Sequence, residues 1–261
     1  MELVTLDRDC QYGNDHNLRA RQRLWQHQEP AFDAIGWVLD LADLAQGSMV
    51  LDVGCGNGLY LAALADRRVS AVGCDLSLGM LEASTHPSLA CADAVALPFP
   101  SGRFDAVLAP HMLYHVPDRQ AAARELRRVM ARGGVCVVVT NGVGHIASVR
   151  ALVEQIVGRS SPGWRMVDWA AEAFSLENGA APLQVAFSEV RCQRPVGVGK
   201  VIITDAAVVA DYVASVADRY QAGVGRPWHE IVDGVRQEVQ QIINRDGAFV
   251  SSGDVGAFIC R

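Results

Sequence analysis

Short apolar runs alternate with amphipathic stretches between residues 49 and 140. The apolar runs predict strands at Met49–Val53, Val69–Cys74, Leu89–Ala92, Phe104–Ala109 and Val135–Thr140. The stretches between them predict helices at Leu59–Leu64, Leu78–Ala83 and Arg119–Met130. Strands that are apolar throughout are buried on both faces. Their alternation with helices therefore predicts an α/β fold with a parallel, doubly wound sheet.

The chain on either side of this alternation is mostly helical. Residues 14–45 carry apolar side chains at helical spacing, and Pro30 divides them into two predicted helices. Two later helical regions, 146–182 and 205–244, are interrupted at 158–163 and 223–227 by glycine and proline. Further strands are predicted at Phe187–Gln193, Val201–Thr204 and Val255–Cys260.

We therefore expect three regions. The first, residues 1–45, is an N-terminal helical cap, and the second, residues 46–145, is the ligand-binding core. The third, residues 146–261, completes the core and inserts helices that cover the substrate. The inserted helices are expected to determine which acceptor is used.

Composition narrows the class of protein. The chain has 261 residues, is 50% apolar, and carries a formal net charge of −6. Such an acidic chain is a poor binder of nucleic-acid phosphates. No run approaches the ~18 apolar residues of a membrane-spanning helix, and residues 1–7 lack the pattern of a secretory signal. We expect neither a membrane segment nor secretion.

The cysteines indicate a reducing compartment, because they are scattered and form no CxxC pair. We expect free thiols, a cytoplasmic location and no metal site. The cysteines are Cys10, Cys55, Cys74, Cys91, Cys136, Cys192 and Cys260. Lys200 is the only lysine among 23 basic residues, which leaves 22 arginines and suggests a GC-rich bacterial source.

The most informative segment is Val50–Gly58, which reads as a strand, a glycine turn and the start of a helix. Gly54 and Gly56 allow the backbone to pass close to a ligand, because a Cβ would obstruct it. The following helix directs its first N–H groups towards that ligand. Leu59 stands where the GxGxxG dinucleotide fingerprint needs its third glycine, which weakens an NAD-binding interpretation.

Two acids follow the next two predicted strands. Asp75 comes about 20 residues after the glycine turn, where a carboxylate accepts hydrogen bonds from ribose hydroxyls. Capping of the helix near Leu78 is the alternative, although Ser77 is the better capping residue. Asp93 follows the third strand and can accept a hydrogen bond from a purine amino group, or it can be a turn residue.

These motifs together resemble the class I S-adenosylmethionine-dependent methyltransferases, in the small-molecule branch that includes the ubiquinone-biosynthesis type. The resemblance spans about residues 48–142. The matching pieces are Val50–Gly58, Ala71–Leu81, Asp93–Pro98, Phe104–Ala109, Met112–Asp118 and Glu125–Gly134. It implies a Rossmann-like sheet of seven strands whose last strand, Val255–Cys260, is antiparallel.

The resemblance also implies cofactor-binding roles. The backbone of Gly54 and Gly56 would lie under the methionine part of S-adenosylmethionine, and Ala109 would face its sulfonium. Asp52 would hold the amino group, directly or through a water molecule, and Asp75 would hold the ribose. Leu76 and Met80 would contact the adenine ring, and Asp93 and the Ala94 N–H would contact the adenine edge. Tyr12 either folds over the cofactor or packs at the surface. Pro110 replaces a residue that is often polar in the family, so no side-chain contact is implied there.

Methyl transfer to an acceptor that must lose a proton needs a base. His111 is the first candidate, because it lies just past the fourth strand at the ligand-binding edge. His115 is the second, and His145 could border the substrate. Packing or a backbone hydrogen bond is the alternative role of each histidine.

Two residue groups remain ambiguous in the sequence. Trp164, Met166, Trp169 and Phe174 either line an apolar acceptor pocket or pack in a core. Arg124, Arg128 and Arg132 fall on one helix face, which we interpret as a solvated surface and not as a nucleic-acid patch.

The leading hypothesis is a methyltransferase that moves a methyl group from S-adenosylmethionine to an oxygen, nitrogen or carbon of a small organic acceptor, with S-adenosylhomocysteine as the other product. The alternatives are an S-adenosylmethionine-binding protein or cyclase that transfers no methyl group, and an RNA methyltransferase. The expected partner is a small molecule, with no nucleic acid or membrane, and the expected state is a monomer or homodimer.

Overall fold

The computed structural model describes residues 13–261. They form two compact units, neither of which is continuous in sequence. The core unit comprises residues 33–143, 168–196 and 255–261. The helical unit comprises the described residues up to 32, together with residues 144–167 and 197–254.

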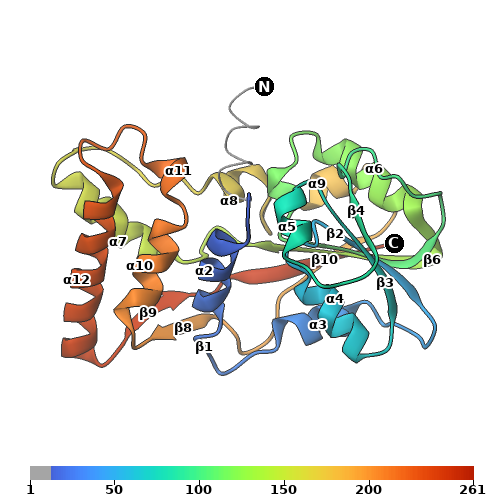
Figure 1. The fold of residues 1–261 in the computed structure, drawn as a ribbon, viewed down its shortest axis with the longest axis horizontal. Coiled ribbons are helices and arrows are strands. Elements are labelled where there is room, and N and C mark those ends of the chain that lie inside the picture. The colour runs from blue at the N-terminus through green and yellow to red at the C-terminus, as the bar shows by residue number, and fades with distance from the viewer. Residues whose placement is uncertain (1–12) are drawn as a thin grey trace. The chain divides into compact units, whose positions relative to one another are not determined.

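The core unit contains the seven-stranded sheet (Figure 1). Its strands, in spatial order, are β4 (Leu89–Cys91), β3 (Ser70–Asp75), β2 (Met49–Val53), β5 (Phe104–Pro110), β6 (Met130–Asn141), β10 (Val255–Cys260) and β7 (Val190–Gln193). The pairs from β4 to β6 are parallel, whereas β10 is antiparallel to both β6 and β7. The expected doubly wound sheet with an antiparallel last strand is confirmed.

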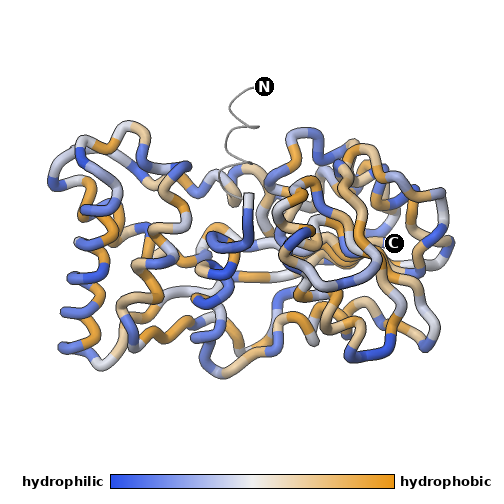
Figure 2. Tube along the Cα trace, in the orientation of Figure 1, coloured by the Kyte–Doolittle hydropathy of each residue, from blue (hydrophilic) through white to orange (hydrophobic). Residues whose placement is uncertain are grey.

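Helices cover both faces of this sheet (Figure 1). On one face, Val38 of α3 (Ala34–Leu41) and Leu64 of α4 (Leu59–Asp66) pack in one apolar cluster with Val50. On the other, Leu126 of α6 (Arg119–Val129) packs with Leu51. Hydrophobic residues are concentrated along the strands in between (Figure 2). Neighbouring residues of β2 thus face opposite layers, which explains why that strand is apolar on both faces.

The remaining helices of the core unit are short. They are α5 (Leu78–Glu82), the 3-10 turn η1 (Leu113–His115), α8 (Trp169–Ala173) and α9 (Ala180–Leu183). The turn η1 follows β5, α8 follows α7 in the chain, and η1 and α8 contact each other.

The helical unit has its own small antiparallel sheet of β1 (Gln28–Glu29), β8 (Lys200–Ile203) and β9 (Phe249–Ser252). Its helices are α2 (His16–Trp25), α7 (Ala147–Gly158), α10 (Ala206–Ala214), α11 (Ala217–Tyr220) and α12 (Trp228–Asp246). They share one apolar cluster that includes Val153, Val209 and Ile231. Among the described helices, none combines the length and the hydropathy required to cross a membrane.

Several elements differ from the sequence-based expectation. Pro30 separates α2 from α3 as predicted, but these helices belong to different units. The strand expected from Phe187 begins only at Val190, because the Phe187 N–H donates to the Leu183 carbonyl at the end of α9. The strands β1 and β9 were not predicted. Such short strands are stabilised by pairing with β8, which local patterns do not reveal.

Candidate functional site

The glycine turn connects the end of β2 to the start of α4. Gly54 and Gly56 have φ angles of 72° and 53°, in the left-handed region that residues with a Cβ rarely adopt. A Cβ on Gly54 would also stand 2.6 Å from the Cβ of Met112. The turn is therefore packed against the segment that follows β5, at the carboxyl edge of the sheet.

Asp75 ties the end of β3 to this turn. Its Oδ2 accepts a hydrogen bond from the Gly56 N–H at 2.9 Å, and its Oδ1 accepts one from the Ser77 N–H at 2.9 Å. Burial raises the pKa of Asp75, and these N–H groups oppose the shift. Ser77 caps α5 by accepting a hydrogen bond from the Met80 N–H, as the sequence suggested.

Asp52 is the least satisfied polar side chain near the turn. It is 0% exposed, and no described group donates a hydrogen bond to either of its carboxylate oxygens. Burial, followed by the nearby charge of Asp75, raises the pKa of Asp52 to about 8. A buried carboxyl group without a donor is costly unless a partner neutralises it. This carboxyl therefore suits a ligand that brings a positive charge or hydrogen-bond donors.

Asp93 and Ala94 follow β4 at the same edge. Asp93 Oδ1 accepts a hydrogen bond from the Val95 N–H at 3.1 Å, which makes a local turn. The Ala92 N–H donates to the Asp75 carbonyl at 2.9 Å and holds this segment beside the end of β3. The structure thus brings together the acidic residues that were predicted from separate strands.

The other predicted cofactor contacts differ in accessibility. Leu76 is 39% exposed and has apolar surface available to a ligand. Met80 and Ala109, at 1% and 0% exposure, pack their side chains in the protein interior. Tyr12 lies outside the described residues.

His111 directly follows β5 and also has a left-handed backbone, with φ 55°. Its N–H donates to the Val139 carbonyl at 2.9 Å, which holds the residue beside β6. Burial lowers the pKa of His111 to about 4, so the imidazole is neutral at pH 7. A neutral imidazole can accept a proton, and the burial that keeps it neutral also makes it a weaker base than an exposed histidine.

His115 belongs to a ring cluster on η1 and α8. Its ring centroid lies 4.6 Å from that of Tyr114 and 5.1 Å from that of Trp169, and the Tyr114 and Trp169 rings meet edge to face at 5.5 Å. The sequence did not single out Tyr114. Its only sequence signal was its position between two candidate histidines.

The structure does not bring His145 into the core unit. In the helical unit, the His145 ring lies 4.3 Å from the Trp25 ring, and its Nδ1 lies 2.9 Å from the Asp254 carbonyl oxygen. His145 is 7% exposed. These contacts match the packing alternative for this residue.

The proposed apolar acceptor group is divided between the units. Trp164 packs near Tyr220 and Trp228 in the helical unit, where Met166 is also buried. Phe174 packs on Phe258 inside the core unit. For Met166 and Phe174, core packing is the role that the structure supports.

The predicted solvated arginine face is wrong for two residues. Arg124 is exposed on α6 as expected, whereas Arg132 is exposed but lies in β6, because α6 ends at Val129. Arg128, however, bonds to Glu125 and to two backbone carbonyls before β5. The spacing of Glu125 and Arg128, three residues apart on one helix, was the available signal.

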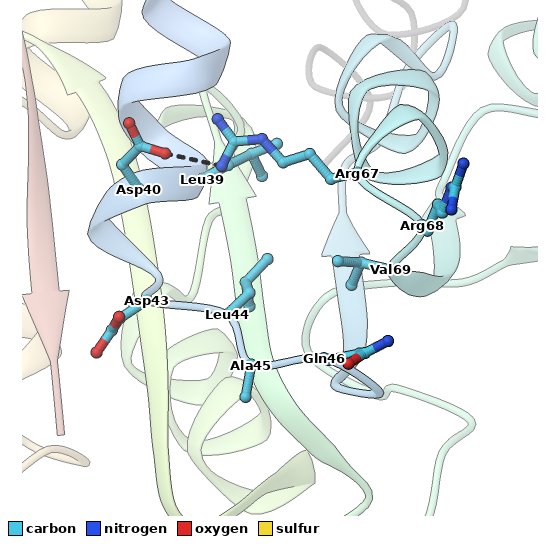
Figure 3. A pocket seen from close by; sticks show the side chains of 9 residues that line it. All are labelled: Leu39, Asp40, Asp43, Leu44, Ala45, Gln46, Arg67, Arg68 and Val69. Carbon is cyan, nitrogen blue, oxygen red and sulfur yellow. Dashed lines mark hydrogen bonds and ion pairs between the residues drawn. The ribbon is translucent and has the colours of Figure 1, made fainter.

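A cavity of about 570 Å³ lies elsewhere in the core unit (Figure 3). It is lined by residues that precede the amino ends of β2 and β3, and an ion pair of 2.8 Å joins Arg67 to Asp40 within it. Ligands of open α/β sheets bind at the carboxyl ends of the strands. This cavity at the opposite edge is therefore not the candidate site. Across residues 13–261, no three His, Cys, Asp or Glu side chains are grouped to hold a metal ion.

The sequence profile of the family described as "Methyltransferase domain" matches residues 51–138. A demethylmenaquinone methyltransferase of Corynebacterium urealyticum is 34% identical over 122 residues, which are 46% of this chain and 53% of that protein. A 2-methyl-6-phytyl-1,4-hydroquinone methyltransferase of Synechocystis is 38% identical over 106 residues, 38% of this chain and 33% of that protein. The chain thus spans about half or less of the length of these curated relatives.

Solved structures resemble the fold over most of the chain. A protein of Anabaena variabilis, assigned as a methyltransferase of an antibiotic biosynthesis pathway, gives a TM-score of 0.65 at 15% identity and covers 87% of this chain and 96% of its own. A phosphoethanolamine N-methyltransferase of Haemonchus contortus, solved with S-adenosylhomocysteine, gives 0.53 at 16% identity, with coverage of 88% and 52%. At these identities the likeness concerns the fold alone.

Proposed function

We propose that this chain, whose residues 51–138 form a class I S-adenosylmethionine-dependent methyltransferase domain, transfers a methyl group from that cofactor to a small organic acceptor. The observation that carries the proposal is Asp52. Its carboxyl is fully buried beside a glycine turn and lacks a described hydrogen-bond donor. The α-amino group of S-adenosylmethionine supplies both a positive charge and donors.

The other residues at this edge fit the same cofactor. Gly54 and Gly56 let the backbone pass close to the methionine part without a Cβ. The Asp75 oxygens accept backbone N–H groups, and a carboxylate has further lone pairs for a ribose hydroxyl. Exposed Leu76 would contact the adenine ring, and Asp93 and the Ala94 N–H would contact its edge.

Bound S-adenosylmethionine supplies a methyl group that its sulfonium already activates. The residues of this chain therefore have to hold the acceptor in line, exclude water and remove a proton where the acceptor carries one. We assign proton removal to an imidazole nitrogen of His111, which burial keeps neutral. His115 packs against both Tyr114 and Trp169 and is assigned to the acceptor wall instead.

A planar ring is the acceptor that we favour. Aromatic rings lie close to His111 along the chain: Tyr114 and His115 follow it by three and four residues. Trp169 adds a third ring from α8, the helix that contacts η1. Ring surfaces of this kind favour flat, unsaturated partners. The two quinol-type names among the relatives agree with this choice.

We further propose that the reaction takes place in the cytoplasm and that the protein is a monomer or a homodimer. We also propose that nucleic acid is not its substrate. The acidic net charge of −6 supports a small-molecule acceptor over a phosphate backbone. The cysteines of the described residues are free thiols, which supports a reducing compartment.

The test has two steps. Titration calorimetry with S-adenosylhomocysteine measures whether the chain binds the cofactor product, and absence of heat at high micromolar ligand would reject the proposal. Incubation with S-adenosylmethionine and 1,4-naphthohydroquinone or hydroquinone, followed by mass spectrometry, then measures methyl transfer. Binding without S-adenosylhomocysteine formation across a wider acceptor panel would favour the non-transferring alternative.

A further inference from the structure

Glu125 and Arg128 of α6 hold the segment that leads from Asp93 to β5. A Glu125 oxygen, Oε2, accepts a hydrogen bond from the Leu97 N–H at 2.8 Å. Arg128 donates to the Phe99 carbonyl at 2.7 Å and to the Leu97 carbonyl at 2.9 Å. Two more hydrogen bonds, of 2.6 and 2.7 Å, join Arg128 to Glu125. The pair therefore closes a network around the backbone of residues 97–99.

This segment is anchored at both ends. Its first end is fixed by the hydrogen bond from the Ala92 N–H to the Asp75 carbonyl. The Glu125–Arg128 pair fixes its second end at Leu97, which is 5% exposed, and Ala94 between the two anchors is 6% exposed. Asp93 and the Ala94 N–H lie on the short stretch between these anchors. Their positions therefore depend on both.

The second anchor is stiff. Arg128 is planar and donates in a fixed fork, so two carbonyls and one carboxylate determine its position together. The hydrogen bond from Arg128 lowers the pKa of Glu125, so the carboxylate is charged at neutral pH. Leu126 and Val129 of the same helix, each 0% exposed, pack in the core. Movement of this pair would require movement of α6.

We propose that Glu125 and Arg128 are positioning residues that set the Asp93–Ala94 segment for recognition of the purine edge of the cofactor. This inference rests on the proposed function. Selectivity for adenine then depends partly on two charged residues of α6. None of the cofactor contacts predicted from the sequence involved this helix. Neither residue is assigned a contact with the cofactor.

Selectivity for the purine edge is the readout that a merely structural role would not change. Calorimetry on the full chain measures the dissociation constants of S-adenosylhomocysteine and of S-inosylhomocysteine, in which an oxo group replaces the 6-amino group. In the wild type, Asp93 should favour the adenosyl ligand. In Arg128→Met this preference should fall about tenfold, because the segment loses its charged anchor.

Matched variants give this test its controls. Arg124→Met removes an exposed arginine of the same helix and should keep the wild-type preference. Arg128→Lys, which retains the charge, should restore part of it. Asp93→Ala should abolish the preference, and adding Arg128→Met to Asp93→Ala should lower it no further.

Four outcomes would count against the inference. An unchanged preference in folded Arg128→Met, or an equal loss in Arg124→Met, would overturn it while leaving the proposed function intact. A wild type that binds neither ligand would reject the proposed function itself. If Arg128→Met does not fold, Glu125→Gln replaces it in the test. This variant removes the charge but retains an acceptor for the Leu97 N–H, and it should also lower the preference for the adenosyl ligand. An unchanged preference in Glu125→Gln would overturn the inference.

Discussion

Replacement of Asp52 by asparagine should stabilise the ligand-free protein and weaken cofactor binding. Asp52 is fully buried, and burial together with Asp75 raises its pKa from 3.8 to about 8. A raised carboxyl pKa means that the folded state retains a proton that the unfolded chain releases. The contribution of this group to stability is therefore present below about pH 4 and is lost as the pH rises towards 8.

The magnitude follows from the same two pKa values. Between pH 3.8 and pH 7, each pH unit costs the folded state about 1.4 kcal/mol, which gives about 4 kcal/mol at pH 7. Asparagine avoids this cost but buries an amide without a described partner, at about 2 kcal/mol. The net gain in the free energy of unfolding is about 2 kcal/mol, or roughly 5 °C in Tm for a chain of this size.

Thermal unfolding of the full chain from pH 5 to pH 8 is the assay. The Tm of Asp52→Asn should rise relative to that of the wild type as the pH rises, because every other titrating group, including His111 with its lowered pKa, is common to both proteins. Asp66→Asn, at an exposed position of α4, is the matched control and should follow the wild type. S-adenosylhomocysteine should bind Asp52→Asn at least about tenfold more weakly, because a charge-assisted hydrogen bond is lost. A lower Tm of Asp52→Asn at pH 7.5, or a pH profile parallel to the wild type, would refute the reasoning.

Three further predictions concern the edges of the sheet. In a denaturant titration, Gly54→Ala should lower the free energy of unfolding by about 3 kcal/mol, because the residue has a left-handed φ and the added Cβ would clash with Met112. Gly47→Ala is the control and should lower it by only about 1 kcal/mol, because Gly47 has a φ of 85° but no atom within 4 Å of an added Cβ. With a hydroquinone that serves as acceptor, His111→Gln should lower kcat by a factor of about 10²–10⁴ and leave the dissociation constant of S-adenosylhomocysteine unchanged. Because the His111 pKa is about 4, ionisation of His111 should not change the wild-type rate above about pH 5. Arg67→Met, in the cavity at the opposite edge, should leave that dissociation constant unchanged (Figure 3).

Specific results would contradict each of these. Equal costs for Gly54→Ala and Gly47→Ala would show that contact with Met112 does not limit position 54. A His111→Gln variant with wild-type kcat would remove His111 as the base. Weaker cofactor binding in Arg67→Met would require the two edges to be coupled.

The core unit was predictable because its signals are local. The strands are apolar on both faces, and the segments between them have helical periodicity. A parallel sheet covered by helices on both faces is one of the few arrangements that satisfies the hydrogen bonds of such strands and buries their side chains. Asp75 and Asp93 could be grouped in advance for the same reason, because residues that follow neighbouring parallel strands meet at one edge. Asp52 joined them only through the family resemblance. The short strand β9 and the late start of β7 carried no such signal.

The sequence by itself determined the alternation of strands and helices, the glycine turn and the acidic residues that follow it, and the family resemblance supplied the count of seven strands. Only the tertiary structure decided the rest, because it depends on contacts between segments distant along the chain. It gathered three separate segments into the helical unit and divided Trp164 from Trp169. It turned Arg128 from a solvated helix residue into an anchor of the Asp93 segment. It also left Asp52 buried without a described donor, and burial of a charge is a property of the surroundings that no residue carries in its own sequence position.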